Sequence, residues 1–337
     1  MYGGSKMKKK KGVVRYNKYG YLFSIPFVVA FLIFQLYPII YTAVIGFTDL
    51  KGVVPGEVHF LKDDVFANFK TVLSSNAFQV AFKNTVMIWL WNFIPQILLA
   101  LVLAAWFTDR RWKIKGQGIY KVLLYMPNII TAATIAILFK SFFDYPKSPV
   151  NDILMKVGIL PAGQPFNFPL SKGWARGIVA FIQFWMWYGY TMLILISGIL
   201  GISPDIYDAA EVDGANKIQT FFKITLPNIR TILLFTLVTS LIGGLNMFDI
   251  PKLFLLGGPD SATKTTSVYI YEQAFSGSYL YNRAAAASMI MFVVIMICTA
   301  ALFLIMRDPD KTGYGKAQAK KIKEQAKLAK KAAKGGM

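Results

Sequence analysis

Six long apolar stretches constrain the fold of this 337-residue chain more than any other feature. Each is about as long as the roughly 20 residues that a helix needs to cross the hydrocarbon core of a bilayer. Membrane-spanning strands are about 10 residues long and alternate in polarity, so only helices suit runs of this length. We therefore predict an all-α polytopic membrane protein with six transmembrane helices, at about residues 21–47, 84–107, 119–143, 176–200, 228–250 and 284–306.

The composition supports a membrane protein and argues against a nucleic-acid-binding one. Hydrophobic residues make up 55% of the chain and charged residues 16%, a balance that a soluble domain of this length does not carry. The formal net charge is +20, but the Lys and Arg residues lie at the ends of the apolar stretches and in the terminal segments. The expected partner for these charges is the bilayer, with no nucleic acid involved.

The distribution of Lys and Arg predicts the orientation in the membrane, because cytoplasmic loops are enriched in them. With the N-terminus inside, 25 of the 37 Lys and Arg residues fall on the cytoplasmic side. We expect both termini in the cytoplasm of a multi-pass protein in a bacterial-type plasma (inner) membrane. The domains are then a basic cytoplasmic arm at 1–20, a membrane domain at 21–306 and a Lys/Ala-rich cytoplasmic tail at 307–337.

A polar segment at 203–227 separates the fourth and fifth apolar stretches and carries helix signals of its own. Ser203 suits an N-cap, and Pro204 suits the first helical turn. Acidic residues then follow in the N-terminal half, where the helix dipole favours negative charge. Gly214 is expected to end this helix before a second short amphipathic turn. The pattern predicts a helix–turn–helix that lies flat under the membrane and faces a cytoplasmic partner.

Several kinds of chemistry have no support in the sequence. There is no G-x-x-x-x-G-K-[ST] loop, so we do not expect the chain itself to bind and hydrolyse ATP. His59 is the only histidine and Cys298 the only cysteine, which leaves no catalytic triad, no metal site and no intrachain disulfide to expect. The apolar stretches hold almost no ionisable groups, which disfavours a proton or sodium pump. We predict a protein that is not an enzyme and needs no cofactor.

The spacing within the polar segment resembles a known signature. Asp208-Ala209-Ala210 is followed after three residues by Gly214 and after nine more by Ile224-x-Leu226-Pro227. This resembles the E-A-A-x3-G-x9-I-x-L-P loop of ABC-importer membrane subunits, with Asp in place of Glu. In that family the loop is a coupling helix that docks in a cleft of the ATP-hydrolysing subunit. The resemblance implies a type I ABC importer permease fold and assigns ATPase coupling to Asp208, Ala209, Ala210, Glu211, Asp213, Gly214, Leu226 and Pro227.

Other segments resemble carbohydrate importers of the maltose and glycerol-phosphate type. They are the first apolar stretch, the Asn246-Met247-Phe248-Asp249 element, the Gly257-Gly258-Pro259 loop and the segment at 265–271. The resemblance implies a permease subunit that forms half of the path for a mono- or oligosaccharide. It also implies three kinds of partner, namely a second homologous permease subunit, two ATP-binding subunits and an extracytoplasmic sugar-binding protein.

Candidates for the substrate path are polar and aromatic residues in the fourth and fifth stretches, where such side chains are costly or unusual. Aromatic faces stack on sugar C–H surfaces, and amides and hydroxyls pair with sugar OH groups. The resemblance points to Tyr188, Gly189, Thr191 and Asn246. Helix packing and interfacial anchoring are the alternative roles for each residue. The full candidate set is Gln183, Trp187, Tyr188, Gly189, Thr191, Asn246 and Phe248.

Two other functions remain open at this point. One is an ABC permease for a solute that is not a sugar, and the other is a stand-alone secondary transporter. Transport in vesicles without any ATPase would distinguish the second from the importer. A membrane enzyme or scaffold has no catalytic constellation to support it.

Overall fold

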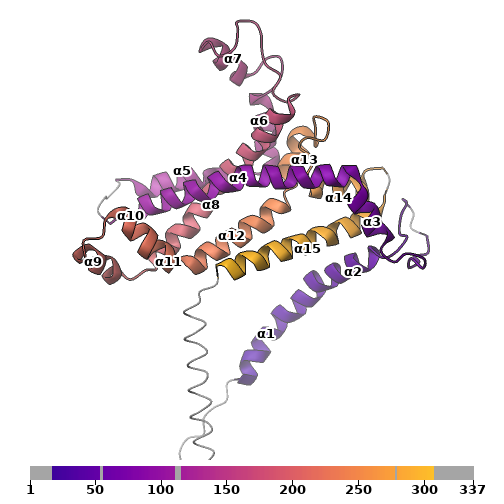
Figure 1. Cartoon of the computed structure of the whole chain (residues 1–337), viewed down its shortest axis with the longest axis horizontal. Coiled ribbons are helices and arrows are strands. Elements are labelled where there is room, and N and C mark those ends of the chain that lie inside the picture. The colour runs from indigo at the N-terminus through magenta and orange to yellow at the C-terminus, as the bar shows by residue number, and fades with distance from the viewer. Residues whose placement is uncertain (1–16, 54–55, 111–114, 278, 307–337) are drawn as a thin grey trace, which may run out of the picture.

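A computed structural model describes residues 17–53, 56–110, 115–277 and 279–306, and this part of the chain is helical (Figure 1). Among these residues the only β-type pairing is an isolated bridge between Thr48 and Phe60. The tail at 307–337 and residues 1–16 of the basic arm lie outside the described residues. The first helix begins at Asn17, inside the segment that the sequence assigned to the arm.

Five helical units are long and apolar enough to cross a membrane, and a bent pair of helices is the sixth candidate. The first unit consists of α1 (Asn17–Phe31), a π-helical segment η1 (Leu32–Leu36) and α2 (Tyr37–Ile45). The other units are α4 (Asn76–Thr108), α8 (Lys172–Leu200), α15 (Tyr281–Ile305) and the stretch Arg230–Leu255, which begins with α12 (Arg230–Leu245). The shorter elements are α3 (Ala67–Ser74), α5 (Gln117–Ile129), α6 (Ala132–Phe142), α7 (Pro149–Lys156), α9 (Pro204–Val212), α10 (Lys217–Thr220), η2 (Phe221–Thr225), α11 (Leu226–Asn228), α13 (Asp249–Leu255) and α14 (Thr266–Phe275).

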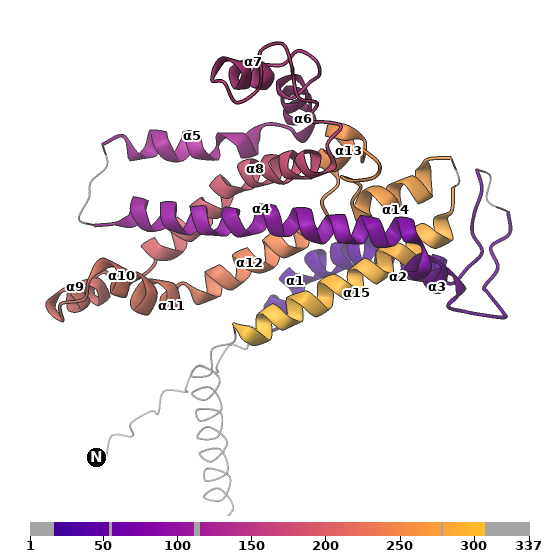
Figure 2. The same cartoon turned by 45° about the horizontal axis from the view of Figure 1, so that its top comes forward.

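The third apolar stretch is not one continuous helix, as 119–143 had been expected to be. Its two parts, α5 and α6, meet at an angle of 92°. Ile130 takes an extended conformation, and Thr131 becomes the N-cap of α6 by accepting a hydrogen bond from the Thr134 amide at 3.3 Å. Such a cap replaces part of the hydrogen bonding that the backbone loses at the break. As a result α6 and α7 project sideways from the bundle (Figures 1 and 2).

The fifth stretch is also interrupted, because α12 ends at Leu245 and α13 starts only at Asp249. Residues 246–248 between them are not helical. The Thr265 hydroxyl donates to the Met247 carbonyl at 2.8 Å and so holds the break in place. The predicted span at 228–250 is therefore a helix that is broken just where Asn246 lies.

The core of the bundle is the seam between α4 and α8, which run side by side in Figures 1 and 2. Near one end Ile88 of α4 packs in a cluster with Ile178 and Ile182 of α8. Near the other end Ala100 and Ala104 of α4 pack against residues 192–199 of α8. By contrast, no residue from Tyr19 to Ile45 in the first unit is buried, and α1 diverges from the other helices (Figure 1).

Small residues set how closely the helices approach, as expected for helices that associate in lipid. At Gly189 of α8 an added Cβ would overlap the backbone carbonyl of Leu124 on α5. At Gly244 of α12 it would overlap the indole ring of Trp89 on α4. With a larger residue at either position, the neighbouring helix could not lie as close as it does.

We predict that Gly189→Ala separates α5 from α8 and lowers the free energy of unfolding by about 1–3 kcal/mol, the usual cost of overpacking. Gly177→Ala is the matched control, because it lies on the same helix and an added Cβ there meets nothing within 4 Å. Thermal unfolding of the two variants in detergent measures the difference. Equal stability of the two variants would contradict the role of Gly189 in packing.

Candidate functional site

The segment at 203–227 folds as two short helices joined by a tight turn, at one end of the bundle (Figure 1). Ser203 is the N-cap of α9, Pro204 occupies its first turn and Asp205 places a negative charge there. These are the positions that the sequence indicated, and they suit the helix dipole and the proline ring. The predicted helix–turn–helix is therefore present, although whether it faces the cytoplasm stays a prediction.

The turn between the two helices depends on Gly214, whose φ is +74°. The Gly214 amide donates to the Glu211 carbonyl at 3.1 Å, and the Ala215 amide donates to the Ala210 carbonyl at 2.9 Å. This pair of bonds is a Schellman motif, which requires a left-handed residue after the helix. Asn216 then caps α10 together with Gln219, each side chain accepting from the other residue's backbone amide. The turn is thus fixed by hydrogen bonds on both sides of Gly214.

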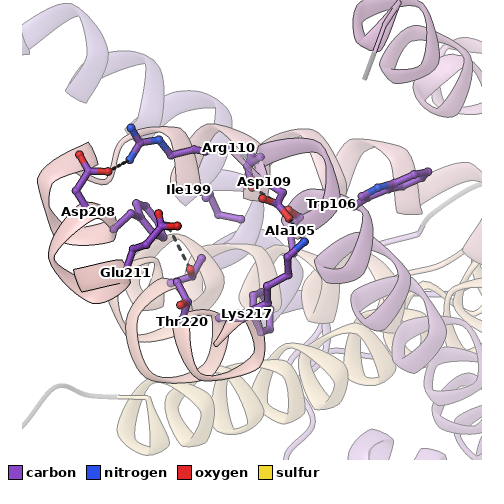
Figure 3. A pocket seen from close by; sticks show the side chains of 13 residues that line it. Ala105, Trp106, Asp109, Arg110, Ile199, Asp208, Glu211, Lys217 and Thr220 are labelled. Atoms are coloured by element: carbon purple, nitrogen blue, oxygen red, sulfur yellow. Dashed lines mark hydrogen bonds and ion pairs between the residues drawn. The ribbon is translucent and has the colours of Figure 1, made fainter. Parts of the chain in front are cut away.

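Charged residues at the end of α4 meet the two helices (Figure 3). Arg110 Nη1 lies 2.6 Å from Asp208 Oδ1 and also donates to the Pro204 carbonyl at 3.2 Å. Lys217 Nζ lies 2.9 Å from Asp109 Oδ2. Asp208, which the resemblance pairs with a residue of another subunit, has therefore a basic partner within this chain.

A pocket of about 620 Å³ lies between the end of α4, the end of α8 and the two short helices (Figure 3). Tyr207 and Thr225 line it and are hydrogen-bonded through their hydroxyl groups at 3.1 Å. Ala210 is buried, whereas Ala209 is exposed, so the two alanines face in different directions. The other residues assigned to coupling are exposed or half-buried at the surface, namely Asp208, Glu211, Asp213, Gly214, Leu226 and Pro227.

Ile206, at 40%, and three further large apolar side chains of this segment are exposed, and none of them was among the predicted site residues. Val212 is 88% exposed, and Ile218 and Phe222 are exposed as well. Exposed apolar groups gathered on one short segment are typical of a surface that another protein covers. The signal available in the sequence was their presence within a polar segment. These residues were not predicted, because the signature specifies only positions on either side of them.

Thr191, a predicted path residue, is buried in a polar contact between three helices. Gln96 of α4 donates through Nε2 to the Thr191 hydroxyl at 2.8 Å and to the Ser240 hydroxyl of α12 at 3.3 Å. Hydrogen bonds of this kind join helices in the apolar interior of a membrane protein. Gln96 is therefore a functional candidate that sequence reasoning missed. The available signal in the sequence was an amide side chain directly after Pro95 within an apolar stretch.

The other candidates on α8 do not share one environment. Trp187 is 43% exposed, whereas Tyr188 is buried and stacks on Phe184 with ring centroids 5.5 Å apart. Gln183 is half-buried and lies one turn before Trp187, on the same side of the helix. Gly189 packs against α5, as described above. Of these residues, Gln183 and Trp187 are the ones whose side chains the described part of the chain does not bury.

Asn246 lies in the break after α12 and is exposed. Its side-chain Nδ2 donates to the Ile242 carbonyl at 3.0 Å, and this bond does not use the side-chain oxygen. Phe248, at the end of the break, is half-buried against Tyr271 with ring centroids 5.2 Å apart. Next to the break, Trp89 lies against Gly244, and the buried Trp89 Nε1 has no hydrogen-bond partner in the described part of the chain. A second group of polar atoms thus lies around the break, separate from the Gln96 contact.

The fold and these two regions define a multi-pass helical membrane protein with an exposed helix–turn–helix at one end and polar groups along its spans. The chain belongs to the family of binding-protein-dependent transport system inner membrane components, which matches residues 84–308. It is therefore a transport permease of the plasma membrane.

Relatives and solved structures agree with this family. The lactose transport system permease protein of Rhizobium radiobacter is 29% identical over 295 residues, covering 87% of this chain and 95% of the relative. The arabinooligosaccharides transport system permease protein of Bacillus subtilis is 29% identical over 84% of this chain and 87% of the relative. A chain of the crystal structure of a bacterial alginate ABC transporter, in complex with an alginate pentasaccharide-bound periplasmic protein, superposes with a TM-score of 0.69. That chain is 26% identical, and the match covers 86% of this chain and 94% of that one.

Proposed function

We propose that this chain forms half of the path of an ATP-driven sugar importer and receives the movement of a separate ATPase through the segment at 203–227. The observation that carries the proposal is the exposed helix–turn–helix, fixed by the Gly214 turn, in a chain of the binding-protein-dependent family. The relatives named for lactose and for arabinooligosaccharides support a sugar as the solute.

The chemistry of the segment suits a docking surface. Its acidic side chains and the exposed Val212 and Phe222 offer both charge and apolar area to one partner. Such a combination favours a specific protein contact over a lipid surface, because acidic groups are repelled by anionic headgroups. We assign Asp208, Ala209, Glu211 and Asp213 to the contact with the ATPase. The Lys and Arg distribution supports a cytoplasmic position for this surface.

The remaining partners follow from the same proposal. A second homologous permease subunit completes the path, two ATP-binding subunits lie below, and an extracytoplasmic sugar-binding protein delivers the solute. The periplasmic protein bound in the alginate importer supports the last of these. ATP-driven closure of the ATPases moves the docked helices, and the spans then open to the outside by rigid-body rocking. The chain contributes no catalytic residue.

Along the path, we propose that the sugar meets Gln183 and Trp187 on α8 and Asn246 and Phe248 at the α12 break. The exposed indole of Trp187 offers a face for stacking, and the Asn246 amide oxygen is available to a hydroxyl group. The buried Tyr188, Gly189 and Thr191 support these positions from behind through helix packing and the bond from Gln96.

We predict that Gly214→Trp prevents co-purification of the ATPase, because a bulky residue is strained at a φ of +74° and the Schellman turn is lost. Gly214→Asn is the control, since Asn tolerates this conformation better than other residues with a side chain. Asp208→Lys, which reverses a charge on the docking surface, should also prevent co-purification. Both variants should still insert into the membrane. An ATPase that co-purifies equally with all of them would contradict the assignment.

We predict that Asn246→Leu lowers sugar uptake about tenfold and changes ATP hydrolysis without sugar much less, because a lost hydrogen-bond partner costs about 1–3 kcal/mol. Asn246→Ser keeps a polar group at the position and should retain more of the uptake. Initial rates of uptake and of hydrolysis are measured in proteoliposomes that hold the complete importer. Uptake kinetics that do not change in the Leu variant would remove Asn246 from the path.

A further inference from the structure

The end of α4 is joined to both helices of the segment at 203–227, the docking segment. Asp109 is the C-cap residue of α4, and Arg110 follows it directly. The arginine pairs with Asp208 on α9, and the aspartate pairs with Lys217 on α10. The two contacted helices lie on opposite sides of the Gly214 turn. Two neighbouring residues of opposite charge thus hold both arms of the helix–turn–helix against one helix end (Figure 3).

Toward its N-terminal end, α4 is hydrogen-bonded to a different segment, the loop at 257–266. Asn84 donates through Nδ2 to the carbonyls of Ser261 and Lys264, at 2.7 and 3.1 Å. Thr85 accepts a hydrogen bond from the Thr266 amide at 2.9 Å. Both α4 side chains are buried, so these bonds are shielded from competition with water. The loop at 257–266 is therefore attached to α4 at the end of the bundle opposite the docking segment.

Between these two ends, α4 is also hydrogen-bonded to neighbouring helices. It is one helix of 33 residues, so the distance from Asn84 to its last residue, Thr108, is about 36 Å at about 1.5 Å per residue. Near its middle, Gln96 bonds to Thr191 of α8 and Ser240 of α12. A movement of the docking segment relative to the bundle must therefore either break the ion pairs at Asp109 and Arg110 or move α4 with it.

We propose that α4 transmits movement between the docking segment and the loop at 257–266, and that Asp109 and Arg110 are the positioning residues of this linkage. The inference rests on the proposed function, because it takes the segment at 203–227 as the part of the chain that moves when the ATPase binds at α9. Single exposed ion pairs are weak. Two pairs on adjacent residues, directed to helices on both sides of one turn, resist sliding in either direction, and this makes them effective here.

The test uses the Asp109–Lys217 pair, because neither residue is among those assigned to the ATPase contact, namely Asp208, Ala209, Glu211 and Asp213. The variants are Asp109→Lys, Lys217→Asp and the double variant with the two charges exchanged. Lys223→Asp is the control, since it makes the same charge change in the same segment and Lys223 has no ion pair among the described residues. In the purified chain, each single variant should raise hydrogen exchange of the α10 amides by about two- to fivefold, and the double variant should restore it.

In the complete importer, each single variant should lower the stimulation of ATP hydrolysis by the sugar-binding protein by about two- to fivefold. Hydrolysis without that protein, and co-purification of the ATPase, should stay as in the unmodified importer. The exchanged pair should recover the stimulation, and the control should not lose it.

Full stimulation in the single variants, no recovery in the exchanged pair, or loss of the ATPase from the single variants would each overturn the linkage. Absence of the ATPase from the unmodified chain would instead overturn the proposed function, and the linkage with it.

Discussion

Lipid offers no hydrogen bonds to the backbone and little hydrophobic force between helices, and the whole structure depends on this constraint. Apolar stretches must be helical, and helices associate only where their surfaces fit closely. The seam between α4 and α8 and the contacts at Gly189 and Gly244 provide that fit. Gln96 adds a polar contact among three helices at the same place where packing is tight. In the proposed linkage, the rigid frame that results transmits movement of the docking segment to the opposite end of the bundle.

The two breaks in the bundle have a common physical explanation. Non-helical backbone within a membrane protein is tolerated where other groups satisfy it or where it lines a cavity. At 130–131 the Thr131 side chain caps the next helix, and at 246–248 the Thr265 hydroxyl bonds to Met247. The second break also places Asn246 and Phe248, which supports the proposal that the solute passes there. Local loss of helix is thus confined to positions that can compensate for it.

The sequence predicted the helical class and the approximate helix ranges, because length and apolarity decide both in a membrane. It did not predict the 92° bend between α5 and α6, since Thr131 lies inside an apolar run and its capping role depends on the fold. In the docking segment the N-cap position of Ser203 and the Gly214 turn were predicted from local residue types, whereas the capping of α10 by Asn216 and Gln219 was not. The pairing of Arg110 with Asp208 was not, because 98 residues separate them and no local pattern connects them. Val212 was missed because exposure is a property of the folded chain.

Photo-crosslinking from Val212 tests the central claim most directly, because its exposed side chain lies on the docking segment without taking part in the turn. A photoreactive residue at 212 is compared with one at 58, which is also exposed but belongs to the segment 56–66 that leads into α3, and α3 lies at the end of the bundle away from α9 (Figure 2). In membranes that hold the complete importer, we expect an adduct with the ATPase from position 212 and none from position 58. An ATPase adduct from position 58, or none from position 212, would contradict the assignment of this segment to coupling.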